Sequence, residues 1–481
     1  MSQDTKSASA KSVLLELVPP EDAPLTPQER KALSRYETMV AEGKEKFETG
    51  FKEIAEAFHQ IRDQRLYRET HHSFAAYFND KWGYGRSYAS EIADDGEIIK
   101  RMSARADTLP LLTSPAHFRP IVHLEEKKQD EIMDVVEKWM KWKSEKTITP
   151  ALIKSAKAFI SPAGKPHPPN AVQQKLVKRF EEIVKETKGK LPPGTSPSIR
   201  KLFDQLKTKA VALGGPRSST GISWADHTWN PLQGCTRVSA GCDRCYAAKK
   251  IATRMADMYP GLATWKKGAD GRKQYLFNGK IVLLPEQLGE PLLDLTPRRY
   301  FVNSMSDLFH KDVPDDFIEA VFQVMEKADW HVFQVLTKRP ERQAEFTHKY
   351  FRDRKPPPNI WLGTTTEDQD SFDKRIPHLR DTRAAVRWLS CEPLLGPIKL
   401  DSPAKIDWVV VGGESDSLRP MKKEWATSLR GQCKKARIAF HFKQWGSFDE
   451  EGKGPKREKH DPLVPATLDG VIHNAYPRVK K

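Results

Sequence analysis

The chain has 481 residues, of which 38% are hydrophobic and 30% charged, so it is too long for a single compact core and apolar enough for two or three packed domains. No stretch approaches the roughly 20 apolar residues that span a bilayer, and residues 13–18 are too short and too acidic for the core of a signal peptide. Five Cys residues, an odd number, argue against a secreted disulfide scaffold. We expect a cytoplasmic protein with reduced thiols and no membrane partner.

The formal net charge of +16 is unevenly distributed along the chain. Residues 1–150 carry 23 basic and 26 acidic side chains, residues 151–218 carry 14 and 4, and residues 219–481 carry 43 and 34. A concentrated positive charge attracts a polyanion, although charged runs also occur as ordinary solvated helix faces. DNA or another nucleic acid is therefore a candidate partner for residues 25–218.

The N-terminal part has helical periodicity. Thr26 to Glu29 has the residue order of a capped helix start. A buried helical stripe is expected at Phe47, Phe51, Ile54, Phe58 and Ile61. A short helix after Ser73, a glycine-containing turn at 82–85 and a second helix over 87–99 have the outline of a helix-turn-helix. This part loosely resembles phage and plasmid partition-type DNA readers, with a helical protein-interaction module as the alternative.

From Gly221 onward the pattern changes to short apolar runs. They start 22 to 31 residues apart, at 300–302, 331–336, 360–362, 386–389, 408–411 and 438–442, with helix-like stretches between several of them. This period predicts a parallel βα barrel, full or partial. The expected organisation is a disordered N-terminus (1–24), an all-α helix-turn-helix-like domain (25–160), a basic helical connector (161–218), the α/β barrel domain (219–448) and a flexible C-terminal tail (449–481).

Polar residues follow most of these runs, and in a parallel barrel such residues meet at the mouth where ligands bind. Four basic residues are candidates to hold a phosphate or carboxylate: Lys338, Arg339, Arg419 and Lys443. The alternative is that they form ion pairs with Glu367, Glu392 or Glu414. Glu392 is the candidate carboxylate for a ribose hydroxyl or a proton relay. The remaining candidate ligand-binding residues are Asn303, Ser304, Ser306, Asp307, Thr364, Glu367, Gly412, Gly413 and Glu414.

Three cysteines lie within 11 residues: Cys235, Cys242 and Cys245. They occupy a glycine-containing loop after a predicted strand at 228–232. A structural zinc site usually has four protein ligands, whereas three thiolates can hold three irons of a 4Fe-4S cluster and leave the fourth iron open. Zinc completed by a residue such as His227, and reactive or incidental thiols, are the alternatives.

Residues 221–448 resemble a known family through several motifs: Trp229-Asn230-Pro231, the three-Cys loop with Cys245-Tyr246-Ala247, Leu336 to Pro340, Cys391 to Leu394 and Gly412 to Ser415. They resemble the three-Cys-motif phage proteins, which are similar to radical S-adenosylmethionine (SAM) enzymes and distantly to spore photoproduct lyase. Three features depart from most radical-SAM enzymes. Six residues separate the first two cysteines, and Arg244 stands where an aromatic residue is usual. The Gly-Gly-Glu that usually follows the second strand comes here only after a late strand, at Gly412-Gly413-Glu414.

The resemblance implies a partial βα barrel, a 4Fe-4S cluster on Cys235, Cys242 and Cys245, and SAM on the open iron. It implies a 5′-deoxyadenosyl radical acting on a substrate related to nucleic acid, and a companion protein of the same family. Tyr246 would stack on adenine. The alternative function is a DNA-binding regulator with a non-catalytic iron–sulfur or zinc site.

Overall fold

The computed structural model describes residues 24–45, 47–83, 85–101, 112, 115–143, 147–162, 222–268, 271–401, 403–415, 419–454 and 466–479. The predicted disordered N-terminus and nearly all of the predicted basic connector lie outside these residues. The chain divides into two compact units. We call Met1–Lys141 with Glu145–Lys157 the helical unit, and Trp142–Ser144 with Ala158–Lys481 the sheet unit.

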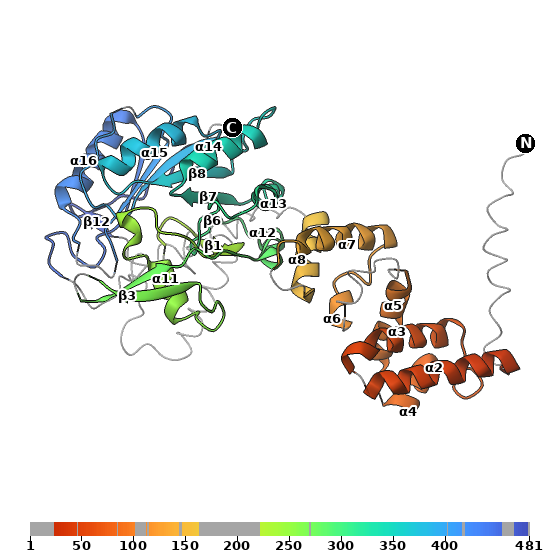
Figure 1. Ribbon diagram of the computed structural model, residues 1–481. Helices are drawn as coiled ribbons and strands as arrows, with labels where there is room; N and C mark the ends of the chain where they lie inside the picture. The colour runs from red at the N-terminus through yellow and green to blue at the C-terminus, as the bar shows by residue number, and fades with distance from the viewer. Residues whose placement is uncertain are drawn as a thin grey trace, which may run out of the picture. The chain divides into compact units, whose positions relative to one another are not determined.

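The first part of the chain is helical, as predicted (Figure 1). Its helices are α2 (Pro27–Glu45), α3 (Phe47–Asp63), α4 (Phe74–Trp82), α5 (Arg86–Arg101), α6 (Pro115–Phe118), α7 (Glu126–Met140) and α8 (Pro150–Ile160). The predicted capped start is confirmed, because the Glu29 amide donates to Thr26 Oγ1 at 3.3 Å while the Thr26 amide donates to Glu29 Oε2 at 2.8 Å.

In the α3 stripe Phe51 and Ile54 are buried, and Phe58 and Ile61 are fully enclosed. Ser73 caps α4 by accepting from the Ala76 amide at 3.2 Å, and Gly83 ends α4 in the left-handed conformation at φ 72°. Helix, glycine turn and helix therefore follow in the expected order, and the finer comparison with DNA-reading helices stays a prediction.

The sheet unit consists of a seven-stranded sheet, helices and three small two-stranded sheets. Its helices are α11 (Tyr246–Thr253), α12 (Glu290–Leu293), α13 (Asp315–Lys327), α14 (Pro340–Tyr350), α15 (Gln369–Asp381) and α16 (Lys423–Ala436), with 3-10 turns η3 (Ala240–Cys242) and η4 (Pro285–Gln287). The large sheet contains β1 (His227–Trp229), β6 (Arg299–Val302), β7 (Val332–Thr337), β8 (Ile360–Thr365), β9 (Val386–Cys391), β10 (Trp408–Gly412) and β11 (Ala439–Gln444). The small sheets pair β2 (Leu232–Gln233) with β5 (Val282–Leu283), β3 (Ala263–Lys267) with β4 (Lys273–Phe277), and β12 (Thr467–Leu468) with β13 (Val471–Ile472).

The large sheet is parallel throughout, and its strands lie side by side in chain order. It curls into a half-barrel, so the partial form of the predicted barrel is what the chain adopts. All six predicted apolar runs are strands. The strand predicted at 228–232 is divided between two sheets. β1 ends at Trp229 in the large sheet, and β2 pairs with β5 in a small sheet, with Leu232 opposite Leu283. Pro231, between them, has no amide to continue the ladder.

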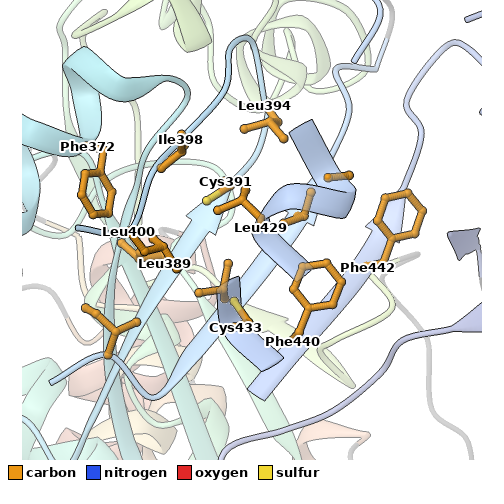
Figure 2. Packing of buried hydrophobic residues seen from close by; sticks show 14 of the residues in the cluster. Phe372, Leu389, Cys391, Leu394, Ile398, Leu400, Leu429, Cys433, Phe440 and Phe442 are labelled. Atoms are coloured by element: carbon orange, nitrogen blue, oxygen red, sulfur yellow. The ribbon is translucent and has the colours of Figure 1, made fainter. Parts of the chain in front are cut away.

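The two faces of the sheet are packed differently. On the convex side, α15 and α16 bury apolar side chains against β9, β10 and β11, as Figure 2 shows for Phe372, Leu389, Leu429 and Phe440. Inside the curl lies a cluster of indoles, Trp224, Trp361, Trp388 and Trp408. Rings this large fill the concave face of the open sheet.

The C-terminal segment differs from the predicted flexible tail. Phe442 donates its amide to His473 O at 2.8 Å, Ala475 donates to Phe440 O at 3.2 Å, and Trp408 Nε1 donates to Ala475 O at 2.9 Å. Residues 473–475 thus lie along β11, and the Tyr476 ring packs against Trp408. Hydrogen bonding to an exposed strand edge explains this order. No helix in the described residues is long and apolar enough to cross a membrane.

Gly363 on β8 is a test of the packing inside the curl. A Cβ there would lie 2.5 Å from two atoms of the Trp388 indole. We expect Gly363→Ala to lower the free energy of unfolding by about 1–3 kcal/mol, because a close-packed ring must move. Gly431→Ala, in helix α16 where nothing lies within 4 Å, is the matched control and should be neutral or slightly stabilising. Thermal unfolding of both variants measures the difference, and equal melting temperatures would contradict the packing argument.

Candidate functional site

The candidate site lies at the carboxyl ends of the strands of the large sheet. Lys338 and Arg339 follow β7, Glu367 follows β8, Glu392 follows β9 and Glu414 follows β10. Residues 234–245, which we call the cysteine loop, connect β2 to α11 and contact several of these side chains through the bonds given below. The parallel arrangement therefore brings together residues that are up to 180 positions apart in sequence.

The three cysteines have different local settings on this loop. Cys235 follows Gly234, Cys242 ends the 3-10 turn η3, and Cys245 is the N-cap residue of α11. All three are free thiols and half-buried. A charge on Cys245 would raise the pKa of Cys235, and a charge on Cys242 would raise that of Cys245, so the sulfurs lie within electrostatic range of one another.

Burial keeps two of these thiols protonated. Burial, followed by the charge of Asp307, raises the pKa of Cys235 to about 12. Burial also raises the pKa of Cys245, even though the Ala248 amide and the charge of Lys338 favour its thiolate. Both groups need a strong electrophile such as a metal ion to lose their protons near neutral pH.

A first anchor of the cysteine loop is the buried ion pair between Asp307 and Arg339. Arg339 Nη1 lies 2.7 Å from Asp307 Oδ2 and 3.8 Å from Cys235 Sγ, while its Nη2 donates to Thr236 Oγ1 at 2.6 Å and to Thr236 O at 3.2 Å. The buried His310 ring also contacts Thr236 Oγ1, at 2.9 Å. The Thr337 hydroxyl and the Lys338 amide complete the bonds to Asp307, at 2.7 and 3.1 Å.

A second anchor is Glu367, which is 1% exposed and therefore needs compensating charge. Its Oε1 accepts from Ser239 Oγ at 2.5 Å, its Oε2 accepts from Arg375 Nη1 at 2.7 Å, and Lys338 Nζ lies 4.0 Å from Oε1. Burial by itself would raise the pKa of Glu367, but the charges of Lys338 and Arg375 hold it below its ordinary value. A Cβ at Gly241 would lie 2.5 Å from Oε1, so the loop backbone packs directly on this carboxylate.

A third anchor is the pair of Glu414 and Arg419. Glu414 is 5% exposed and accepts from Arg419 Nε at 2.7 Å. Arg419 Nη2 also donates to Ala240 O at 3.1 Å, in the 3-10 turn that ends at Cys242. Three carboxylates from three different strand ends thus hold one loop, each with an arginine partner.

Glu392 and Lys443 form a further ion pair inside the mouth, with each side chain 18% exposed. Glu392 is close enough to Tyr246 for its charge to act on the phenol. Tyr246 is 49% exposed and donates its hydroxyl to Ser304 O at 2.7 Å. This part of the mouth presents a carboxylate, an ammonium and an aromatic ring close together.

The remaining candidates mostly hold the backbone in place. Asn303, at φ 64°, donates to Ser306 Oγ at 2.7 Å, and Ser306 Oγ donates to Leu232 O at 2.8 Å. Ser304 Oγ donates to Asn230 Oδ1 at 3.1 Å. Thr364 is buried and donates to Thr337 O at 2.8 Å. Gly412 and Gly413 are buried in the mouth, and a Cβ on Gly412 would lie 3.3 Å from the Glu392 carboxyl carbon.

The sequence analysis missed two members of this network. Arg375 lies in α15 among other charged helix residues, and no local pattern separates it from a solvated one. Thr236 is one of several hydroxyl residues in the loop. The ion-pair alternative is borne out for Lys338 with Glu367, whereas Arg339 pairs with Asp307 rather than with a glutamate.

The comparison with protein families matches residues 219–477 to a family described as a protein of unknown function (DUF5131). The chain belongs to this family. The matched region contains the cysteine loop, the large sheet and most of the C-terminal segment, whereas the helical unit lies outside it. No curated protein and no solved structure matches the chain. The relation to phage proteins and to radical-SAM enzymes stays a prediction.

As a metal site, the cysteine loop meets only part of the requirement. It offers three thiols within electrostatic range of one another, with Arg339 and Lys338 nearby to stabilise negative sulfur. Within the described ranges, however, no group of three or more His, Cys, Asp or Glu side chains is arranged to hold a metal ion. Metal binding on all three sulfurs would require proton loss and a closer approach of the thiols.

The raised pKa values predict slow alkylation of the folded chain. At pH 8, iodoacetamide should modify Cys235 roughly 100- to 1000-fold more slowly than in the urea-unfolded chain, because the thiolate fraction falls with a pKa near 12 instead of 9.0. The buried Cys391 and Cys433, whose pKa values burial also raises to about 12, are internal references. Mass spectrometry of peptides measures each rate, and fast modification of Cys235 would contradict the enclosed setting.

Two variants separate charge from loop mobility at Cys235. Asp307→Asn removes a negative charge and should lower the pKa of Cys235, so alkylation should become about three- to tenfold faster. Arg339→Gln removes a positive charge and should slow the reaction by a similar factor. A loop that had merely loosened would react faster in both variants, and that result would contradict the electrostatic account.

Proposed function

We propose that the three thiols of the cysteine loop hold a 4Fe-4S cluster and that this protein is a radical-SAM-like enzyme. The observation that carries the proposal is the loop itself, which places three neighbouring thiols at the carboxyl ends of a parallel half-barrel. Three buried ion pairs fix that loop, although an ordinary surface loop needs none. Several charged contacts around free thiols favour a reactive centre over a group of incidental cysteines.

In this proposal Cys235, Cys242 and Cys245 are the cluster ligands. A bound 4Fe-4S cluster with an open iron would supply one-electron reducing chemistry toward SAM. The chain would contribute binding, orientation and exclusion of water. Arg339, 3.8 Å from Cys235 Sγ, and Lys338 would stabilise the negative sulfurs.

The exposed face of Tyr246 would stack on adenine next to Cys245. Glu392 and Lys443 form an ion pair with each other. On ligand binding they would separate, so that Glu392 accepts a hydrogen bond from a ribose hydroxyl and Lys443 binds a carboxylate. We assign Glu414 a positioning role, because Arg419 already occupies both of its oxygens. Asn303, Ser304, Ser306, Asp307 and Thr364 support the mouth by the backbone contacts described above.

Anaerobic reconstitution with iron and sulfide tests the proposal. We expect about four irons and a brown chromophore per chain, and 5′-deoxyadenosine after SAM and dithionite are added. Cys235→Ser, Cys242→Ser and Cys245→Ser should each lose most of the iron. Cys433→Ser, at a buried cysteine of helix α16, is the matched control and should keep it.

Other results would point to other functions. A brown protein that does not cleave SAM would favour the regulator with a non-catalytic cluster. A colourless protein with one bound zinc would favour a structural metal. If the three cysteine-loop substitutions leave the iron content unchanged, the assignment of these cysteines as cluster ligands is wrong.

A further inference from the structure

Next to the cysteine loop lies a positively charged segment that the sequence analysis did not single out. Residues 244–280 contain nine Lys or Arg residues and two Asp residues, whereas the whole of 219–481 has a net charge of only +9. This segment of 37 residues therefore has a net charge of +7, which is most of the net charge of residues 219–481. It folds as α11 followed by the hairpin of β3 and β4.

The hairpin packs on α11 at its base and is bonded to the cysteine loop near its turn. Ala263 and Phe277 pack with Ile251 of α11 in a small apolar cluster that also contacts Cys245. Arg244, the residue before Cys245, donates from Nη1 to Lys273 O at 3.2 Å. Any molecule held on the hairpin would therefore lie beside the cysteines.

Strand register places an aromatic and basic surface on one face of the hairpin. Trp265 is opposite Tyr275, and Lys267 is opposite Lys273, so these four side chains share the face that packs at its base through Ala263 and Phe277. Trp265 is 55% exposed, which is unusual for an indole in a folded chain. Lys273 Nζ lies 4.3 Å from the centroid of its ring.

We infer that this face binds single-stranded nucleic acid. Lysines on the hairpin suit phosphates, and an exposed indole suits stacking with an unpaired base, the combination that proteins use for single strands. Base pairs in a duplex leave no free base face for Trp265 to cover. The inference goes beyond the proposed function, because it holds whether or not the thiols bind iron.

Fluorescence anisotropy with the full chain and a labelled oligothymidine of about 20 nucleotides tests this surface. Trp265→Ala should weaken binding about tenfold, and Trp265→Phe should retain affinity within about twofold of the parent. Lys267→Ala with Lys273→Ala should weaken binding and reduce the salt slope by about 1.4, the value for two phosphate contacts on a single strand. Lys434→Ala with Lys435→Ala, two exposed lysines on α16, is the charge-matched control.

Further measurements complete the test. If oligouridine binds as well as oligothymidine, the surface is a general one for single strands. Circular dichroism verifies that each variant is folded. Ultraviolet crosslinking of the unsubstituted chain should label a peptide within 263–277, which needs no variant at all. Equal affinity of Trp265→Ala and the parent chain, tighter binding of the corresponding duplex, or equal losses in the α16 control would each overturn the inference.

Discussion

The site depends on the neutralisation of three buried carboxylates by arginines. Asp307, Glu367 and Glu414 leave three different strand ends, and each connects an arginine to the cysteine loop or contacts that loop itself. Removing one partner of a buried pair leaves an uncompensated charge, at a cost of about 3–5 kcal/mol. The loop position and the folding of the sheet are therefore coupled, and the thiols cannot move freely without breaking charged contacts.

The interior of the curled sheet explains why a half-barrel can be stable. The seven strands form an open sheet, and indoles from β8, β9 and β10 and from the segment before β1 fill its concave face. Residues 466–479 then cover the edge strand β11 by hydrogen bonding. The indoles fill the concave face and the C-terminal segment covers one edge of the sheet. A ligand can therefore bind at the polar mouth, at the carboxyl ends of the strands.

Several expectations could be made correctly from local sequence. Apolar runs spaced by a βα period predicted six strands, and the cap at Thr26 predicted the start of α2, because both signals depend on near neighbours. The hairpin of β3 and β4 was missed, since Trp265 and its lysines alternate without any buried face. The order of residues 466–479 was missed because its partner, β11, lies far away in sequence.

The sequence by itself determined that three thiols share one loop and that polar residues follow the strands of a parallel sheet. The sequence could not assign ion-pair partners. A charged helix residue such as Arg375 has the same local sequence pattern whether it faces water or a buried glutamate. Tertiary structure decided that Arg339 neutralises Asp307, that Glu414 is held by Arg419, and that a basic hairpin lies against the cysteines. The reason is that burial and distance set the strength of a charge, and both arise only when distant segments pack together.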